Sequence, residues 1–329
     1  MTTGAFVLSL DFELYWGMRD RRTLEAYGPR ILGVRQALPR MLAAFDAHGV
    51  KATIATVGLL FFRDKASLRA GLPALRPGYT NTMLSPYHGH IDGIGVDEQH
   101  DPYHFGASLV RLIQQHPAHE IAGHTFSHYY CLERGQTEAE FAADLEAAQR
   151  AAAAYGIALR SFVFPRNQYN ERYLALCHAH GIRAYRGNER SWLYDARNRE
   201  DESRFRRALR LLDTWLPLSG PNTHAWPVVQ DGLPVDVPSS RFLRPWSPRY
   251  AMLDGMKLRR ITRAMDHAAG RGELFHLWWH PHNFGADLER NMAFLERVLA
   301  HYTHLHRSTG LRSLTMTEVA EEARSRHGR

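Results

Sequence analysis

Short apolar segments alternate with longer segments whose apolar residues recur at helical spacing, and this alternation constrains the fold most. Expected strands cover residues 5–10, 52–57, 120–122, 162–164, 183–185 and 274–279. Expected helices cover residues 30–48, 137–155, 171–180, 253–269 and 287–301. Strands that alternate with helices form a parallel sheet, so the chain is predicted to be an α/β protein. Its 329 residues fit a single (β/α) barrel.

Two long stretches interrupt the alternation. Residues 66–104 are rich in Gly, Pro, Tyr and His, and residues 187–250 are rich in Pro, Arg and Trp. Neither stretch is bounded by a clear linker, so we expect one domain over residues 1–329 with two insertions. Long irregular insertions in a compact α/β domain are often functional loops, and in a barrel they would rim the mouth and shape substrate access.

The net charge of +7 raises the question of a nucleic-acid partner. Lysine occurs only at positions 51, 65 and 257, and the arginines are scattered without a basic–aromatic repeat or a helix-turn-helix pattern. We therefore predict no nucleic-acid partner. An anionic small substrate, such as a nucleotide sugar, is compatible with the charge.

The N-terminal segment and the cysteines bear on the compartment. The segment MTTGAFVLSLDFEL has no basic start and no small-residue cleavage site, so we interpret it as a buried strand rather than a signal peptide. No apolar run approaches the roughly 18 residues that span a membrane. Cys131 and Cys177 are too few for a disulfide framework. These features predict a cytoplasmic protein.

Polar residues follow several of the expected strands directly. Apolar runs lead into Asp11 and Glu13, into His124, into Arg166 after a proline, and into His280. In a (β/α) barrel the carboxyl ends of different strands converge on one face, which holds the active site. We therefore expect these carboxylates and imidazoles to share one pocket, as a metal hydrolase requires.

The segment HTFSH at 124–128 is the strongest local signal. Histidines at i and i+4 lie on one face of a helical turn, so His124 and His128 are predicted to reach one metal ion. Asp11 and Glu13 are two residues apart, so in an extended strand both carboxylates face the same side. A buried carboxylate needs a nearby cation or proton, and a metal would supply the cation. The alternative is a strand-end carboxylate that caps the next helix or pairs with an arginine.

Four motifs occur in order along the chain. They read SLDF at 9–12, HTFSH at 124–128, FVFPRNQYN at 162–170 and HPH at 280–282. Together with GVKAT at 49–53 and the passage at 181–185, they are similar to the polysaccharide deacetylase family, also described by NodB homology or as carbohydrate esterase 4-like. The resemblance covers roughly residues 5–185 and 273–285. It implies a distorted (β/α)7–8 barrel related to the TIM barrel.

The resemblance implies a divalent metal, usually zinc, held by two histidines and an aspartate, with a second aspartate as general base and a late histidine as general acid. Carried over by position, His124 and His128 are metal ligands, Asp11 is the base and His280 is the acid. Cobalt and nickel suit such ligands as well. A metal with these ligands keeps a position open for water and the substrate carbonyl.

The chain departs from the family pattern at two positions. Phe12 stands where the metal-binding aspartate is expected, and Asp11-Phe12-Glu13 resembles an Asp-x-Glu variant. Either Glu13 supplies the third ligand, or Asp11 binds the metal while Glu13 or water handles the proton, or metal binding has been lost as in allantoinase-like relatives. The family's arginine in the third motif is also altered, and Arg166 is the candidate that replaces it electrostatically.

Four further residues are candidates for substrate binding. Trp279 and His282 flank His280, although a tryptophan pair there also suits the barrel core and His282 is an alternative acid. Arg241 and Arg244 suit a substrate phosphate, because guanidinium groups match its geometry, and surface ion pairs are the simpler explanation.

These observations predict a metal-dependent deacetylase that removes an N-acyl group, first of all acetyl, from an amino sugar or a related small amide. The expected substrate is an N-acyl sugar or a sugar nucleotide. Two alternatives stay open: a metal-independent amidohydrolase of the allantoinase type, and a catalytically inactive carbohydrate-binding barrel.

Overall fold

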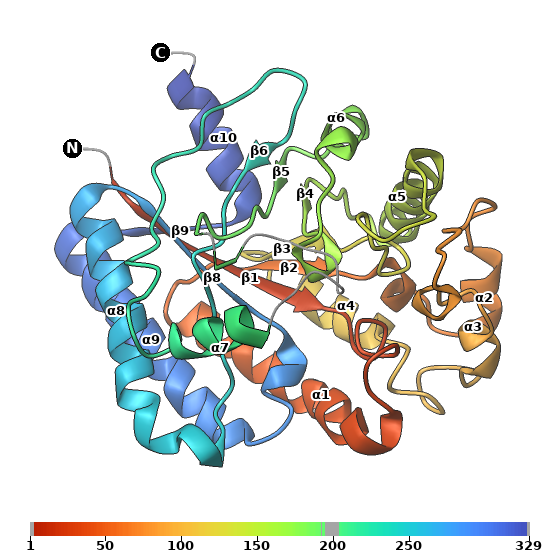
Figure 1. The fold of residues 1–329 in the computed structure, drawn as a ribbon, viewed down its shortest axis with the longest axis horizontal. Coiled ribbons are helices and arrows are strands. Elements are labelled where there is room, and N and C mark those ends of the chain that lie inside the picture. Colours follow the sequence, from red (N-terminus) through yellow and green to blue (C-terminus); the bar gives the residue numbers. More distant parts are fainter. Residues whose placement is uncertain (1–2, 192, 195–203, 328–329) are drawn as a thin grey trace.

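Strand β1 (Ala5–Phe12) forms the centre of the fold, and all its residues are buried. The computed structural model describes residues 3–191, 193–194 and 204–327. β1 pairs in parallel with β8 (Leu274–Trp279) on one side and with β2 (Thr53–Thr56) on the other. The short strand β9 (Arg312–Leu314) pairs with the first residues of β1 (Figure 1).

The strands follow the order β6-β5-β4-β3-β2-β1-β8-β7. The bounds of the others are β3 (Glu120–Gly123), β4 (Ser161–Phe162), β5 (Ala184–Tyr185), β6 (Val235–Asp236) and β7 (Arg241–Phe242). Residues 237–240 join the two edge strands. There the amide of Ser239 donates to the carbonyl of Gly187 at 2.9 Å, and the amide of Ser240 donates to the carbonyl of His276 at 2.8 Å. The sheet therefore curls into a barrel, which confirms the predicted distorted (β/α) architecture.

Helices connect the strands and cover the outside of the barrel (Figure 1). They are α1 (Leu24–Ala47), α2 (Lys65–Ala70), α3 (His90–Gly93), α4 (Ala107–Gln114), α5 (Glu138–Ala153), α6 (Glu171–Ala179), α7 (Arg204–Leu212), α8 (Asp254–Arg271), α9 (Leu288–Thr309) and α10 (Met316–His327). Short 3₁₀ turns cover Gly58–Phe61, Thr82–Leu84, Pro165–Asn167, Pro248–Leu253 and Pro281–Asn283. Within the described residues, no helix is both long and apolar enough to cross a bilayer.

The amino-terminal end of the barrel is filled by small and apolar side chains. Ala5 and Val7 of β1 point into the barrel and share a buried cluster with Met316, Val319 and Ala320 of α10. The other face of β1 packs its Phe and Leu residues into the larger core beneath the surrounding helices. The core thus closes one end of the barrel and leaves the opposite, carboxyl end for the functional site.

Capping residues explain where the helices begin. Thr23 accepts a hydrogen bond from the amide of Ala26 at 3.3 Å, so α1 begins at Leu24 rather than at the predicted residue 30. Thr137 and Glu140 form a capping box at the start of α5, close to the predicted start. The prediction for β8 was correct at both ends.

The two irregular stretches have different roles. Residues 66–104 fold over the chain that leaves β1, where Nε1 of Trp16 donates to the carbonyl of His104 at 2.7 Å. Residues 187–250 contain α7, β6 and β7, so the prediction that this whole stretch rims the mouth is wrong for the two strands that complete the barrel. Residues 192 and 195–203 of this stretch lie outside the described residues.

Candidate metal centre and active site

A cavity of about 680 Å³ opens at the carboxyl ends of the barrel strands. Seven of the predicted site residues line it, namely Asp11, Glu13, His128, Arg166, Arg241, Arg244 and His280. These residues come from β1, from β7, from the loops after β3, β4 and β7, and from the end of β8. The strand-end pattern therefore brings distant parts of the sequence to one place.

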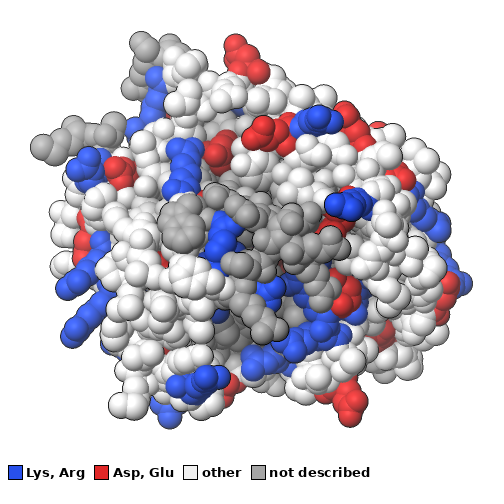
Figure 2. Space-filling model, viewed as in Figure 1, with Lys and Arg blue, Asp and Glu red and all other residues white. Residues whose placement is uncertain are grey.

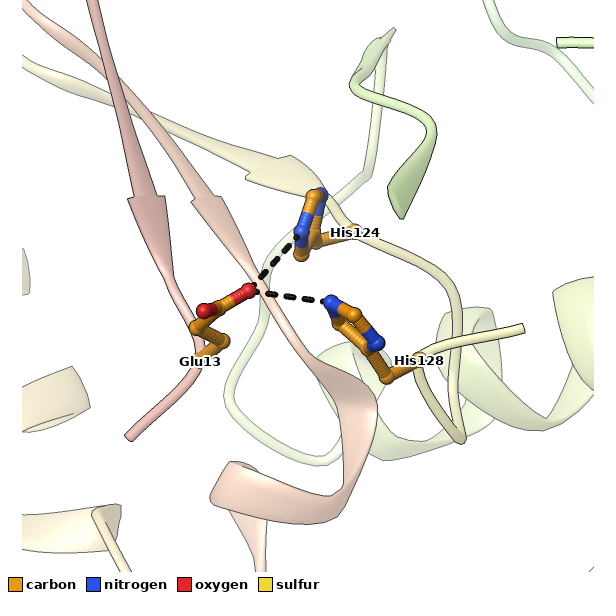
Figure 3. A group of neighbouring side chains, drawn as sticks. All are labelled: Glu13, His124 and His128. Atoms are coloured by element: carbon orange, nitrogen blue, oxygen red, sulfur yellow. Dashed lines mark hydrogen bonds and ion pairs between the residues drawn. The ribbon is translucent and has the colours of Figure 1, made fainter. Parts of the chain in front are cut away.

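Glu13, His124 and His128 face one another beside this cavity (Figure 3). The Nε2 atoms of His124 and His128 lie 3.5 Å and 2.9 Å from Oε2 of Glu13, and all three side chains are at most 3% exposed. Ligand atoms around one tetrahedral zinc lie roughly 3.3 Å apart, given metal–ligand bonds of about 2.0–2.2 Å. The three side chains therefore have the spacing and the chemistry of a metal-binding group.

Hydrogen bonds to the other ring nitrogens show which histidine atoms are free to bind a metal. Nδ1 of His124 donates to the carbonyl of Val163 at 2.8 Å, and Nε2 has no hydrogen-bond partner within the described chain. Nδ1 of His128 lies 3.1 Å from the hydroxyl of Tyr130, which donates onward to Asp20. Nε2 of both rings thus points at the Glu13 carboxylate, at hydrogen-bond distance for His128, and Nε2 of His124 carries the lone pair that a cation would accept. Burial lowers the pKa of His128 to about 4, so this ring is neutral at pH 7.

The loop that holds the two histidines is not the predicted helical turn. Thr125 and His128 have φ angles of 61° and 59°, in the left-handed region. The buried Asp144 on α5 accepts hydrogen bonds from the amides of Phe126 and Ser127, which fixes this irregular path. The ligand atoms of the two imidazoles and Glu13 lie within 4.8 Å of one another, but the predicted helical geometry of residues 124–128 is wrong.

Asp11 is held by an arginine that the sequence prediction missed. Nη1 and Nη2 of Arg186 donate to the two carboxylate oxygens of Asp11 at 2.6 Å and 2.8 Å. Burial alone would raise the pKa of Asp11, but the Arg186 guanidinium outweighs it, so this pKa is lowered. Arg186 comes directly after β5, so the strand-end rule applied one residue further would have found it.

Gly17 is a second residue that the prediction missed. A Cβ atom at this position would lie 2.1–2.3 Å from the carboxyl atoms of Glu13. The Glu13 side chain therefore occupies the space that any larger residue would need. Only knowledge of this close approach, which no local pattern reveals, would have identified Gly17.

His280 lies on the open side of the two carboxylates. Its Nε2 is 3.7 Å from Oδ2 of Asp11 and 3.7 Å from Oε1 of Glu13, and its side chain is 24% exposed to the cavity. This position lets one imidazole reach both the acidic pair and a molecule in the cavity.

One family model matches the middle of the chain. Residues 27–185 match the family model described as Polysaccharide deacetylase. Over these residues the chain is similar to a polysaccharide deacetylase domain. The matched region includes His124, His128 and Arg166, while the acidic pair on β1 and His280 on β8 lie outside it. No curated protein sequence matches the chain significantly.

Solved structures support the same fold. A provisionally assigned polysaccharide deacetylase from Mycobacterium smegmatis is 16% identical with a TM-score of 0.64, over 99% of this chain and 91% of that one. A similarly assigned protein from Pseudomonas aeruginosa PAO1 is 12% identical with a TM-score of 0.57, over 98% and 91%. The Puue allantoinase is 12% identical with a TM-score of 0.58, over 99% and 91%. At these identities the likeness establishes the fold alone.

Arg166 does not contact Asp11. It pairs with Asp20, and its guanidinium lies 4.1 Å from the ring centroid of Tyr130. The predicted replacement of the family's arginine by Arg166 is therefore wrong, because Arg186 makes the contact with Asp11. Arg166 instead supports Tyr130, the hydrogen-bond partner of His128.

Alternation along β8 separates Trp278 from Trp279. Trp278 faces the cavity, and the Arg186 guanidinium lies 4.2 Å from its ring centroid. Trp279 points the other way and is fully buried, with its ring stacked 5.6 Å from that of Phe284. The prediction that Trp279 binds substrate is therefore wrong, because adjacent residues of a strand face opposite sides and Trp278 is the one that faces the cavity.

The remaining substrate-binding candidates fall into two groups. His282 is buried behind His280, with ring centroids 4.8 Å apart, and does not line the cavity, so a substrate contact is not supported. Arg241 and Arg244 line the cavity on the side of β7.

Proposed function

We propose that the deacetylase domain hydrolyses the amide of an N-acyl amino sugar, with acetyl as the first acyl group to test. Glu13, His124 and His128 would hold a divalent metal, zinc by preference, with cobalt and nickel also suited to these ligands. The observation that carries the proposal is that two buried imidazoles, each tied through Nδ1, direct Nε2 at one buried carboxylate. A metal bound there supplies Lewis acidity for the amide carbonyl and the attacking water.

In this proposal Asp11 is the general base. Its two hydrogen bonds from Arg186 keep the carboxylate ionised and fix its orientation toward the cavity. The carboxylate accepts the proton of the attacking water as the carbonyl carbon becomes tetrahedral. The roles of the two carboxylates are assigned from their partners. Glu13 faces the two imidazoles and is the proposed metal ligand, whereas Asp11 faces a guanidinium and is the proposed base.

His280 is the proposed general acid. An amine leaves readily only when protonated, and an imidazole is the side chain suited to donate that proton near neutral pH. His280 is the exposed member of the histidine pair at 280 and 282, and its ring lies next to those of Phe242 and Trp278 at 6.0 Å and 5.8 Å. These two aromatic rings offer an apolar wall for a sugar ring.

The test is acetate release from N-acetyl hexosamines and their oligomers, followed by NMR on the full chain. We expect zinc-loaded protein to release acetate, and both chelated protein and the Asp11→Asn variant to lose this activity. Equal activity after complete chelation would overturn the metal-dependent proposal and favour the allantoinase-like alternative. Zinc binding without turnover of any N-acyl sugar would favour the inactive carbohydrate-binding barrel.

A further inference from the structure

Among the described residues, basic side chains outnumber acidic ones in the lining of the cavity. Eight Lys and Arg residues of the described chain line it, against four described Asp and Glu residues. Among the basic residues are Arg241, Arg244 and Lys257, from β7, the segment after it and α8. Lys and Arg side chains also gather around the middle of the face in Figure 2. Neutral N-acetyl sugars would not require this charge.

Arg241 is buried with part of its guanidinium unpaired. The residue is 5% exposed, and Nη1 donates to the carbonyl and to Oδ2 of Asp213, each at 3.2 Å. Its Nε and Nη2 atoms have no hydrogen-bond partner anywhere in the described residues. Leaving buried donors unpaired is costly, so a ligand that accepts from them would gain their hydrogen bonds.

The neighbouring acids do not neutralise Arg241 fully. Asp213 also accepts from Nη2 of Arg260 at 2.7 Å, so two guanidinium groups share one carboxylate. Glu189 lines the same cavity, but burial raises its pKa to about 8, so this carboxyl is mostly protonated at pH 7. A positive charge therefore remains at Arg241.

Arg244 adds a second guanidinium three residues further on. Its side chain makes no hydrogen bond or ion pair within the described part of the chain, although it lines the cavity. Nζ of Lys257 donates to the backbone carbonyl of Arg244 at 3.3 Å, which helps to fix this segment. Phe242 lies between the two arginines in the sequence, and its ring is 6.0 Å from that of His280. The basic side of the cavity thus adjoins the proposed acid.

We propose that Arg241 and Arg244 form an anion subsite that binds a phosphate group of the substrate while its amide lies at Glu13 and His280. This inference rests on the proposed deacetylase function, and it narrows the substrate to a phosphorylated N-acyl sugar. Guanidinium groups bind phosphate oxygens through paired N–H donors, and a cavity of this volume holds more than one sugar ring. The phosphate could belong to a nucleoside diphosphate sugar or to a polyprenyl-phosphate sugar, which share this chemistry.

Calorimetric titration with pyrophosphate tests the subsite without any turnover. We expect Arg244→Gln to weaken binding about tenfold, the loss typical of one charge-assisted contact, and Arg241→Lys to weaken it measurably while it keeps the ion pair with Asp213. The exposed Arg297→Gln on α9 is the matched control and should bind like the wild type. Equal binding by wild type and Arg244→Gln, with unchanged melting temperatures, would overturn the subsite.

Kinetics then separate the subsite from the deacetylase proposal. We expect a lower KM for a phosphorylated N-acetyl sugar than for the neutral sugar, with the difference lost in Arg244→Gln and kcat largely kept. Comparing the nucleoside diphosphate sugar with the polyprenyl-phosphate sugar in detergent identifies the source of the phosphate. Equal KM values for neutral and phosphorylated sugars would overturn the subsite and leave the deacetylase proposal intact. Pyrophosphate binding that depends on Arg244, without cleavage of any amide, would support the subsite and overturn the deacetylase proposal.

Discussion

Two groups among the described residues each bring one carboxylate and two imidazoles within 4.8 Å of one another. Glu13, His124 and His128 lie at the carboxyl end of the barrel strands and are buried. Asp46, His116 and His119 lie near the amino-terminal end of β3, where the Asp46 side chain is 43% exposed. By composition alone, the two groups are equally good candidates for a metal site.

The backbone partners of the imidazoles separate the two groups. Nδ1 of His124 donates to a carbonyl, so Nε2 carries the lone pair that a metal needs. Nδ1 of His119 accepts from the amide of Ala52 at 3.2 Å, so its Nε2 carries the proton and points at Asp46, 3.4 Å away. The second group is therefore a carboxylate that faces two imidazoles as hydrogen-bond donors. The two groups contain the same residue types, so their capacity to bind a metal depends on which nitrogen of each ring carries the lone pair.

Removal of one imidazole from each group should give the largest contrast. We expect His124→Ala to lose the bound metal and to reduce amide hydrolysis to the level of chelated protein, because one of three ligands is gone. His116→Ala should keep both. Metal content by mass spectrometry and acetate release measure the two effects. A loss of metal in both variants would mean that the ring tautomers do not distinguish the two groups.

Replacement of the acids should give the next largest effect. Asp11→Asn is expected to lower kcat about 10²- to 10⁴-fold with metal still bound, since it removes the proposed base but no ligand. Asp46→Asn should leave kcat unchanged. Steady-state kinetics on zinc-loaded protein checks both, and loss of zinc from Asp11→Asn would instead make Asp11 a ligand.

The hydroxyl behind His128 provides a smaller, graded test. Tyr130→Phe removes the oxygen that faces Nδ1 of His128, so we expect zinc affinity to fall about 10- to 100-fold, as for other outer partners of metal-bound histidines. Tyr155→Phe is the matched control, because its hydroxyl donates only to the carbonyl of Phe61, remote from the site. Competition with a chromophoric chelator measures the affinity. An unchanged affinity in Tyr130→Phe would show that this contact does not support the ligand.

The His119 group should affect stability and not metal binding. His119→Leu leaves the amide of Ala52 without its acceptor, so the free energy of unfolding at pH 7 should fall by about 1–3 kcal/mol. Burial also lowers the pKa of His119 in the folded protein. Below about pH 6.5 the unfolded chain therefore binds a proton at this residue more readily than the folded protein does, so the free energy of unfolding decreases as the pH is lowered. Urea unfolding between pH 7 and pH 5 should show a shallower decline in His119→Leu than in the wild type. The same decline in both proteins would exclude His119 as its source.

The sequence predicted those site residues that directly follow a strand. It did not predict residues whose role depends on contacts between distant parts of the chain. Apolar runs that end at Asp11, His124 and His280 indicated the residues that meet at the cavity. Arg186 was missed because the strand-end rule was not applied to the residue after β5, although the predicted end of that strand at residue 185 is correct. Trp279 was chosen over Trp278 because two adjacent tryptophans do not reveal which faces inward.

The fold shows the same division. The alternation of strands and helices predicted the barrel, and β8 was predicted to the residue. β6 and β7 are only two residues long each, so no periodicity marks them, yet they complete the barrel. The loop at 124–128 is fixed by Asp144 on a helix further along the chain, which a local pattern cannot indicate.

Anomalous diffraction at the zinc edge, from crystals of zinc-loaded protein, tests the central claim most directly. We predict one peak, bonded to Nε2 of His124, Nε2 of His128 and a carboxylate oxygen of Glu13, and no peak between Asp46, His116 and His119. A peak at the second group alone, or a metal bonded to Asp11 in place of Glu13, would contradict this account.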